Sequence, residues 1–515
     1  MPESRIKKTF RNSTVGIISY LLNAGLSFIG RIVFIRTLGV EYLGIGGLFS
    51  NILVMLSLSD LGIYTVMTYS LYKPIAENDT EKIAVYIHYF QKLYNIIAFV
   101  VLWIGLALIP ILPQIVNGSD LAYNDLIKYY VILLANSVVS YFAISKSTLF
   151  RADQNVYIVR IITTVTNAMM HVTQIILLVV FRNYVAFLVC QVCFTFGNNL
   201  VLSIMATKKY PYLKNKTKNG PEKDVNSKII QNLKASFLYK VGSLVLNSTD
   251  NILISIIVST VMVGYYTNYV TVFSLVNAFI MIIIEAVLAS VGNYIATESD
   301  EKKYRLFRTL MLIMYMIAAF CVSCYIAGMN DFIRIWLGDE FVIGGAFIFA
   351  LSINRFVFCS IHPLWMMRES SGVFSETQFV MIGAAVINLI LSVILGNCWG
   401  ITGIILATAI SYLLTVYWFE PIQLSRKIFH VPLRDYWRYV LKLLGSCAFP
   451  IIFASFVYRF ETNNIVFLVL KFLGCGLVAF GTFYVMFKNS EEFNGLYSMV
   501  RRTIFKGSDK QIENT

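Results

Sequence analysis

Polar and ionisable residues recur at helical spacing inside strongly apolar stretches of the chain. The clearest run lies within residues 157–181 and consists of Arg160, Thr163, Asn167, His171 and Gln174. Steps of three or four residues place these side chains on one face of a helix. An arginine is able to bind an anion, and a histidine is able to move a proton. This face therefore predicts a binding or transport site.

Five further apolar stretches carry side chains of the same kind. They contain Ser19, Asn23, Ser27 and Arg31; Asp60; Ser243, Asn247, Asp250, Asn251 and Ser255; Asn277 and Glu285; and Arg355 and His362. Charged groups inside a membrane are costly, so they mark the path of a substrate or an ion. Each arginine has a second interpretation, in which it pairs with a carboxylate on another helix or reaches the membrane interface.

Several arginines in an apolar setting suit a large anionic head group. A guanidinium group stays protonated when partly desolvated and forms paired hydrogen bonds to phosphate. The predicted substrate-binding residues are Arg31, Arg160, Arg355, Asp60, His171 and His362. Asp60 also suits a helix cap beside Gly62, and the histidines suit packing or proton transfer rather than metal binding. No metal site is predicted.

Membrane-spanning helices must position these residues. The 515 residues are 57% hydrophobic and only 14% charged, with a mean hydropathy of +0.70, whereas soluble domains carry about 25% charged residues. Windows of about 20 apolar residues predict about fourteen spans: 14–35, 43–68, 91–112, 127–148, 157–181, 184–206, 236–258, 263–288, 307–328, 341–364, 377–396, 399–419, 438–458 and 464–487. We expect the first window to be retained, because it is longer than a signal-peptide core and lacks a cleavage site.

The distribution of positive charge predicts the orientation of these spans. The outer loops of this plan hold only five of the 42 Lys and Arg residues, namely Arg36, Lys128, Arg182, Arg334 and Arg459. By the positive-inside rule, both termini are expected in the cytoplasm. The basic segment 208–235 suits anionic lipid headgroups, and no nucleic-acid partner is expected.

The chain contains an internal repeat. Shifted by 220 residues, segments 43–45, 75–82 and 115–120 match 263–265, 295–302 and 335–340, and Arg31 corresponds to Asn251 and Gly30 to Asp250. Because six spans separate the copies, matching segments fall on the same side of the membrane, which indicates a parallel repeat.

The predicted fold is therefore an all-α polytopic membrane protein with two six-helix lobes around a central cavity. The predicted parts are an N-terminal lobe (1–207), a cytoplasmic linker (208–235), a C-terminal lobe (236–420), an appendage of two helices (421–487) and a cytoplasmic tail (488–515). Two lobes around a cavity are typical of transporters. Nucleotide-binding and hydrolase motifs are missing from the sequence, and the CxxC pairs at 190–193 and 321–324 lie within spans, so we expect neither an enzyme nor a bound cofactor.

Two segments carry a resemblance to a known family. Residues 36–44 (RTLGVEYLG) and 59–62 (SDLG) resemble the first two spans of bacterial polysaccharide flippases. These Wzx-like proteins belong to the multidrug/oligosaccharidyl-lipid/polysaccharide exporter superfamily, and the resemblance extends to about residue 487. It implies that undecaprenyl-diphosphate-linked oligosaccharide repeat units cross from the inner to the outer leaflet of the bacterial cytoplasmic membrane. The product would be a lipopolysaccharide, capsule or cell-wall polymer, with the polysaccharide polymerase machinery and membrane lipids as partners.

The resemblance also implies a site for ion coupling, as in an antiporter. In some lipid II flippases, sodium binds between spans seven, eleven and twelve, which here corresponds to Asp250, Asn388, Ser392, the carbonyl group of Ile404, and Thr408. Ser392 is neutral where a second carboxylate is expected, so a proton is the alternative to Na⁺. Glu285 is a further candidate for coupling or gating, and Asp250 alternatively forms a standing ion pair with an arginine.

Other functions remain to be weighed against this one. A multidrug or cation exporter would need an anionic cavity, and a lipid II flippase differs in its substrate. A membrane glycosyltransferase or ligase would need a large outer loop with catalytic residues, whereas the predicted outer loops are short. A membrane scaffold would not need charged residues within its spans.

Overall fold

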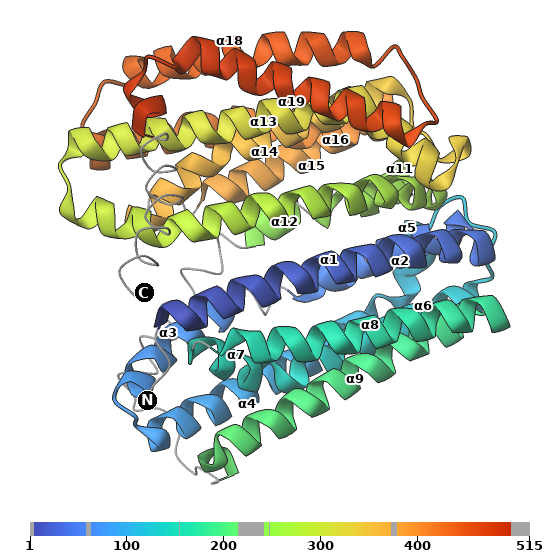
Figure 1. Ribbon diagram of the computed structural model, residues 1–515. Coiled ribbons are helices and arrows are strands. Elements are labelled where there is room, and N and C mark those ends of the chain that lie inside the picture. The colour runs from blue at the N-terminus through green and yellow to red at the C-terminus, as the bar shows by residue number, and fades with distance from the viewer. Residues whose placement is uncertain are drawn as a thin grey trace, which may run out of the picture. The chain divides into compact units, whose positions relative to one another are not determined.

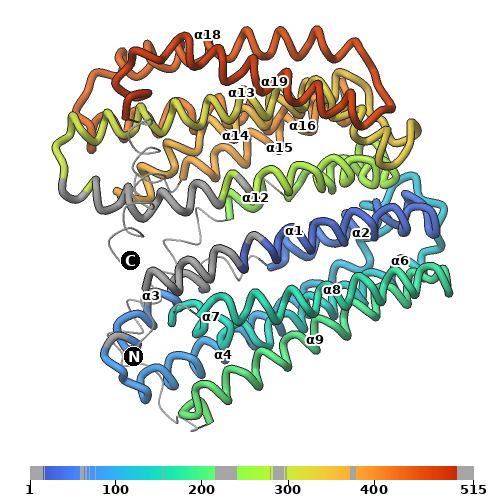
Figure 2. The backbone as a smooth tube through the Cα atoms, in the orientation of Figure 1, coloured from blue at the N-terminus to red at the C-terminus, as the bar shows by residue number. Residues whose placement is uncertain are grey.

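The computed structural model describes residues 5–57, 63–153, 155–214, 241–246, 248–371 and 379–495. Throughout these residues the regular secondary structure is helical, and none of them lies in a strand (Figure 1, Figure 2). The prediction of an all-α fold is therefore confirmed. The chain divides into two compact units, residues Met1–Thr267 and Asn268–Thr515, and each is described by itself. The predicted lobe boundary at 208–235 remains a prediction, because most of that segment lies outside the described residues.

The first unit contains the following described helices. They are α1 (Arg5–Leu38), α2 (Val40–Leu56), α3 (Ile63–Ala76), α4 (Thr80–Ala107), η2 (Ile109–Ile111), α5 (Leu112–Ile115), α6 (Tyr123–Ser140), η3 (Tyr141–Ala143), α7 (Ile144–Ala152), α8 (Val156–Phe181), α9 (Tyr184–Lys209), η4 (Pro211–Lys214), α11 (Asp250–Ile257) and the beginning of α12 (Thr260–Thr297). Helix α8 packs along both α1 and α9, and α2 contacts α6 and α11.

The second unit is built around one long helix. It contains the rest of α12, then α13 (Asp300–Leu337), η5 (Asp339–Phe341), α14 (Gly345–Ser371), α15 (Val380–Trp399), α16 (Ile401–Leu414), α17 (Val416–Leu424), the π-helix η6 (Ser425–Phe429), α18 (Leu433–Val457) and α19 (Ile465–Phe487). Helix α13 packs against α14, α18 and α19, which explains why most of its apolar length is buried within the unit.

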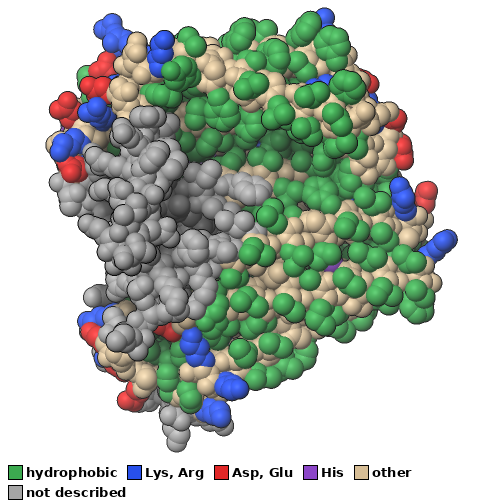
Figure 3. Space-filling view, viewed as in Figure 1, with side chains coloured by type: hydrophobic (Ala, Val, Ile, Leu, Met, Phe, Trp, Pro, Cys, Tyr) green, Lys and Arg blue, Asp and Glu red, His purple; other side chains and the backbone are tan. Residues whose placement is uncertain are grey.

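Eleven of the described helical segments are long and apolar enough to cross a membrane. They coincide with eleven of the fourteen predicted windows. The windows 43–68, 236–258 and 263–288 instead meet shorter helices or run across residues that are not fully described. In each unit, apolar side chains cover the middle of the helices and charged side chains gather near their ends (Figure 3). This pattern is that of a multi-pass membrane protein.

The helix boundaries support the internal repeat. Helices α2 and α12 begin at residues 40 and 260, and α4 and α13 begin at 80 and 300, so both pairs are separated by 220 residues. Gly118 and Gly338, which also correspond, both have positive φ angles, of 66° and 121°. A left-handed conformation at equivalent positions is one that glycine adopts without strain.

Two corresponding glycines allow a close helix crossing within the first unit. Gly44 of α2 lies against the carbonyl oxygen of Thr260, and Gly264 of α12 lies against the carbonyl oxygen of Val40. A methyl group at either glycine would overlap that oxygen. The contact is reciprocal, because Val40 and Thr260 also correspond under the 220-residue shift. Small residues permit such approaches between membrane helices.

Candidate functional site

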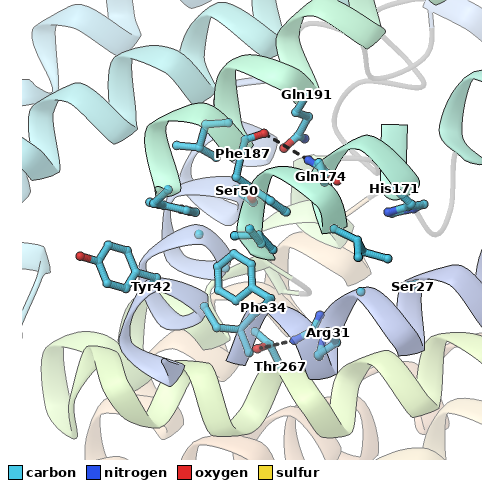
Figure 4. A pocket seen from close by; sticks show the side chains of 18 of the residues that line it. Ser27, Arg31, Phe34, Tyr42, Ser50, His171, Gln174, Phe187, Gln191 and Thr267 are labelled. Carbon is cyan, nitrogen blue, oxygen red and sulfur yellow. Dashed lines mark hydrogen bonds between the residues drawn. The ribbon is translucent and has the colours of Figure 1, made fainter. Parts of the chain in front are cut away.

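A pocket of about 280 Å³ lies within the first unit (Figure 4). Residues of α1, α2, α8, α9 and the first turns of α12 line it, together with Leu133 of α6. Its walls are largely apolar, which is the usual composition of a ligand site with a few placed polar groups. The interhelical packing of α1, α8 and α9 thus brings together side chains that are distant in sequence.

Arg31 supplies the positive charge of this pocket. It is the only Lys or Arg among the lining residues, and its Nη1 donates a hydrogen bond of 3.3 Å to Oγ1 of Thr267. Its side chain is half-buried. A guanidinium group carries five N–H donors and a permanent positive charge, which suit an anionic ligand. The predicted substrate role of Arg31 therefore stays open to test.

The polar face of α8 contributes two of its five predicted members to the pocket. His171 and Gln174 both line it, one helical turn apart. Gln174 is only 4% exposed, and its Nε2 donates a hydrogen bond of 3.2 Å to the backbone oxygen of Phe187 on α9. This bond orients the amide and joins the two helices beside the pocket.

Aromatic side chains form the wall at the N-terminal end of α9. Tyr184 is buried, with ring centroids 5.2 Å from Tyr42, 5.8 Å from Phe34 and 4.8 Å from Tyr129. Phe34 also contacts Phe187 edge to face at 5.1 Å. Edge-to-face packing holds such rings rigidly, so this wall has a fixed shape.

Arg160 lies elsewhere in the first unit. It is exposed and does not line the pocket, and its guanidinium group lies against Gly16 on α1. The side chain at Asp60 lies outside the described residues, as does the side chain of Glu285. The structure therefore groups Arg31 with His171, and it does not group Arg160 with them.

Arg355 and His362 belong to α14 in the second unit. The guanidinium carbon of Arg355 lies 4.5 Å from the centre of the Phe273 ring and 6.0 Å from that of Phe358. His362 is buried, and its Nδ1 lies 2.8 Å from the carbonyl oxygen of Phe358. Cation–π contact and ring packing account for much of the surroundings of both residues.

Three of the residues predicted for ion coupling meet between α15 and α16. Asn388, Ser392 and Thr408 are all buried, and Nδ2 of Asn388 donates a hydrogen bond of 3.1 Å to Oγ1 of Thr408. Within the described part of the chain, Oδ1 of Asn388 and Oγ of Ser392 have no hydrogen-bond partner. Asp250 begins α11 in the first unit and is half-buried. The donor set of the second unit is neutral, and its oxygen atoms suit a cation.

Two groups of buried ion pairs in the second unit were not predicted from the sequence. Arg368 and Glu420 are 2% and 1% exposed, with Nη1 and Oε1 2.5 Å apart. Asp331 accepts from Lys471 at 2.5 Å and from Arg334 at 2.8 Å. The first pair lies just beyond the apolar windows 341–364 and 399–419, since α14 and the helical segment after α16 continue past them. Arg368 and Glu420 each lie in a helix that continues past a predicted apolar window. This position was the sequence feature that could have identified them.

Comparison with solved structures shows which known proteins share this fold. The fold matches "Lipid II flippase MurJ, inward closed conformation" with a TM-score of 0.68 and 12% identity, covering 93% of this chain and 99% of that one. It matches an inward-facing multidrug resistance MATE family transporter of the MOP superfamily at 0.61 and 14%, covering 79% and 94%. A MOP-superfamily transporter from Pyrococcus furiosus, described as having a binding pocket of reversed polarity, matches at 0.54 and 14%, covering 81% and 96%. The chain therefore shares the fold of these solved transporters.

The sequence also matches a family model. Residues 9–289 match the family described as "Polysaccharide biosynthesis protein", and the chain belongs to this family. No curated protein matches the chain. The expected relationship is thereby confirmed for membership of the polysaccharide biosynthesis family and for the fold, which the chain shares with a lipid II flippase and a multidrug transporter.

Proposed function

We propose that this protein translocates an undecaprenyl-diphosphate-linked oligosaccharide repeat unit from the inner to the outer leaflet of the bacterial cytoplasmic membrane. The observation that carries the proposal is the position of Arg31 in a pocket with largely apolar walls, where it is the single Lys or Arg among the described lining residues. A desolvated guanidinium group binds phosphate strongly and disfavours an organic cation. Family membership supports a role in polysaccharide export, for which lipopolysaccharide, capsule and cell-wall polymers are candidate products.

Arg31→Ala tests this proposal. Loss of charge-assisted hydrogen bonds should weaken binding of undecaprenyl diphosphate by about tenfold or more. Arg31→Lys should restore only part of the affinity, because an ammonium group lacks the planar pair of donors. Arg182→Ala is the control, since Arg182 is exposed in the turn between α8 and α9. Native mass spectrometry of the purified protein measures binding, and unchanged affinity in Arg31→Ala would refute the proposal.

The proposed transport is coupled to an ion gradient, with Na⁺ or H⁺ as the ion. Support comes from the buried oxygen atoms of Asn388 and Ser392 and from the position of Asp250 at the start of α11. Binding a cation would neutralise the Asp250 carboxylate or complete the coordination of the neutral oxygen set. We include Glu285 and Thr408 among the residues proposed for ion coupling.

Asp250→Asn distinguishes coupling from a standing ion pair. If Asp250 couples transport, the variant should bind undecaprenyl diphosphate normally while its flipping in vesicles no longer responds to an imposed Na⁺ or H⁺ gradient. Asp125→Asn is the matched control, because Asp125 forms a surface pair with Lys128. Gradient dependence equal to that of the unmodified protein would exclude Asp250 from coupling.

A further inference from the structure

The pocket that contains Arg31 has a second polar region, with a different chemistry. Gln174, Gln191 and Ser50 line it, and we call these three residues the amide end (Figure 4). In that view they lie on the opposite side of the Phe34 ring from Arg31 and Thr267. The three residues of the amide end are uncharged, and among the described residues that line the pocket Arg31 is the only Lys, Arg, Asp or Glu.

The side chains of the amide end suit a ligand with several hydroxyl or amide groups. Each glutamine amide offers two N–H donors and an acceptor oxygen, and a serine hydroxyl both donates and accepts. The neighbouring rings of Phe34, Tyr42 and Phe187 present apolar surface with a polar edge at the tyrosine. A sugar ring has this combination of apolar faces and hydroxyl groups around its rim.

The size of the pocket limits what it holds. Its volume of about 280 Å³ is at the lower limit for sites that bind drug-sized molecules, which occupy about 300–1,000 Å³. This volume suits one monosaccharide-sized group beside Arg31.

We propose that the amide end binds the first sugar of the substrate, the one attached to the diphosphate, and that this sugar is uncharged. The inference rests on the proposed function, which places phosphate at Arg31. A neutral hexose or acetamido sugar exchanges hydrogen bonds with Gln191 and Ser50 as it leaves water. A uronic acid would bring a carboxylate into a region where the described lining residues provide no further Lys or Arg, and a desolvated charge without a partner is costly. The pocket thus discriminates between substrates by the charge of their first sugar and not by the sugars that follow it.

Gln191 is the position at which to test this subsite. It lines the pocket, whereas Gln174 also joins α8 to α9 through its bond to Phe187. Gln191→Leu keeps a similar volume and removes the donors and the acceptor. Gln191→Asn is the conservative variant, and Cys193→Leu is the control on the same helix, because Cys193 is exposed and does not line the pocket.

The probes are undecaprenyl diphosphate alone, the same lipid with one N-acetylhexosamine, and the same lipid with one hexuronic acid. Native mass spectrometry of the full chain gives each dissociation constant. We expect the N-acetylhexosamine to improve binding by about tenfold over the sugar-free lipid, as hydrogen bonds in a desolvated site do. The hexuronic acid should give no such gain. Gln191→Leu should remove the gain without changing the affinity for the sugar-free lipid, and Gln191→Asn should retain part of it.

The outcomes separate this inference from the function on which it rests. Equal binding of the sugar-free and N-acetylhexosamine lipids by the unmodified protein would overturn the subsite, and so would a full gain in Gln191→Leu. If the hexuronic acid lipid binds as tightly as the N-acetylhexosamine lipid, the inference that the first sugar is uncharged is wrong. Normal binding of the sugar-free lipid by Arg31→Ala would instead overturn the phosphate site, and a gain that still depends on Gln191 would then leave the sugar subsite standing.

Discussion

At the scale of single residues, the ion pair between Arg368 and Glu420 places two charged side chains in the interior of the second unit. Both side chains are almost completely buried, and their closest atoms are 2.5 Å apart. Glu369 lies 3.6 Å from the same guanidinium group but is about half exposed, so it is a weaker partner. A buried ion pair adds little net stability because desolvation offsets its attraction, but the loss of one partner leaves an uncompensated charge.

This asymmetry gives a prediction for two single variants and their combination. Arg368→Met or Glu420→Leu alone should each lower the free energy of unfolding by about 3–5 kcal/mol. The double variant should recover most of that loss, because neither charge remains. Unfolding in an SDS titration measures all three. A double variant whose loss equals the sum of the single losses would contradict the buried-pair account.

The candidate pocket illustrates what the sequence predicted at this scale. Arg31 and His171 were predictable because a charge or an imidazole in an apolar window stands out, and helical spacing put Gln174 on the face of His171. Gln191 and Tyr184 were missed because neutral polar and aromatic residues are common in membrane helices and carry no such signal. Arg160 was predicted for the site but lies outside the pocket. It shares a helical face with His171, and that face continues beyond the pocket.

At the scale of elements, the crossing of α2 and α12 depends on having no side chain at Gly44. The carbonyl oxygen of Thr260 occupies the space that a Cβ atom would need, and backbone atoms cannot move aside as a flexible side chain can. Helix starts at 40 and 260 place the two glycines at the same distance from their helix beginnings. Apolar windows predicted these helices, but only the repeat suggested that the glycines are equivalent.

Gly44→Ala should therefore separate the two helices. We expect it to lower the free energy of unfolding by about 1–3 kcal/mol, the usual cost of overpacking. Gly25→Ala is the control, because nothing lies within 4 Å of a Cβ atom at Gly25 on α1, and alanine favours a helix. The control should be neutral or slightly stabilising in the same SDS titration. Equal stability of the two variants would show that the crossing does not require a glycine.

At the scale of the whole molecule, the pattern of basic residues predicts which helix ends face the cytoplasm. In the part of the chain that the structure describes, eleven long apolar helices identify a multi-pass membrane protein. Hydrophobicity decides where the spans lie, whereas orientation depends on the charges of the connecting segments. Orientation is for this reason a separate prediction from the fold.

Cysteine labelling tests the orientation. Lys208 is exposed near the end of α9, and Lys128 is exposed near the start of α6. In intact cells, Lys128→Cys should react with a membrane-impermeant thiol reagent, and Lys208→Cys should react only after the membrane is opened. The unmodified protein, with its eight cysteines, is the blank. Labelling of Lys208→Cys in intact cells would reverse the proposed topology.

The reciprocal glycine contact has a consequence for how two copies of one ancestral segment diverge. Gly44 meets the counterpart of Val40, and Gly264 meets Val40 itself, which is the kind of contact that a twofold homodimer makes. In a homodimer, one codon specifies both sides, so every substitution appears twice. Joining the copies in one chain gives each its own codon. Arg31 and its counterpart Asn251 are then free to differ. The chain carries a positive charge at position 31 without a second one at the equivalent position 251.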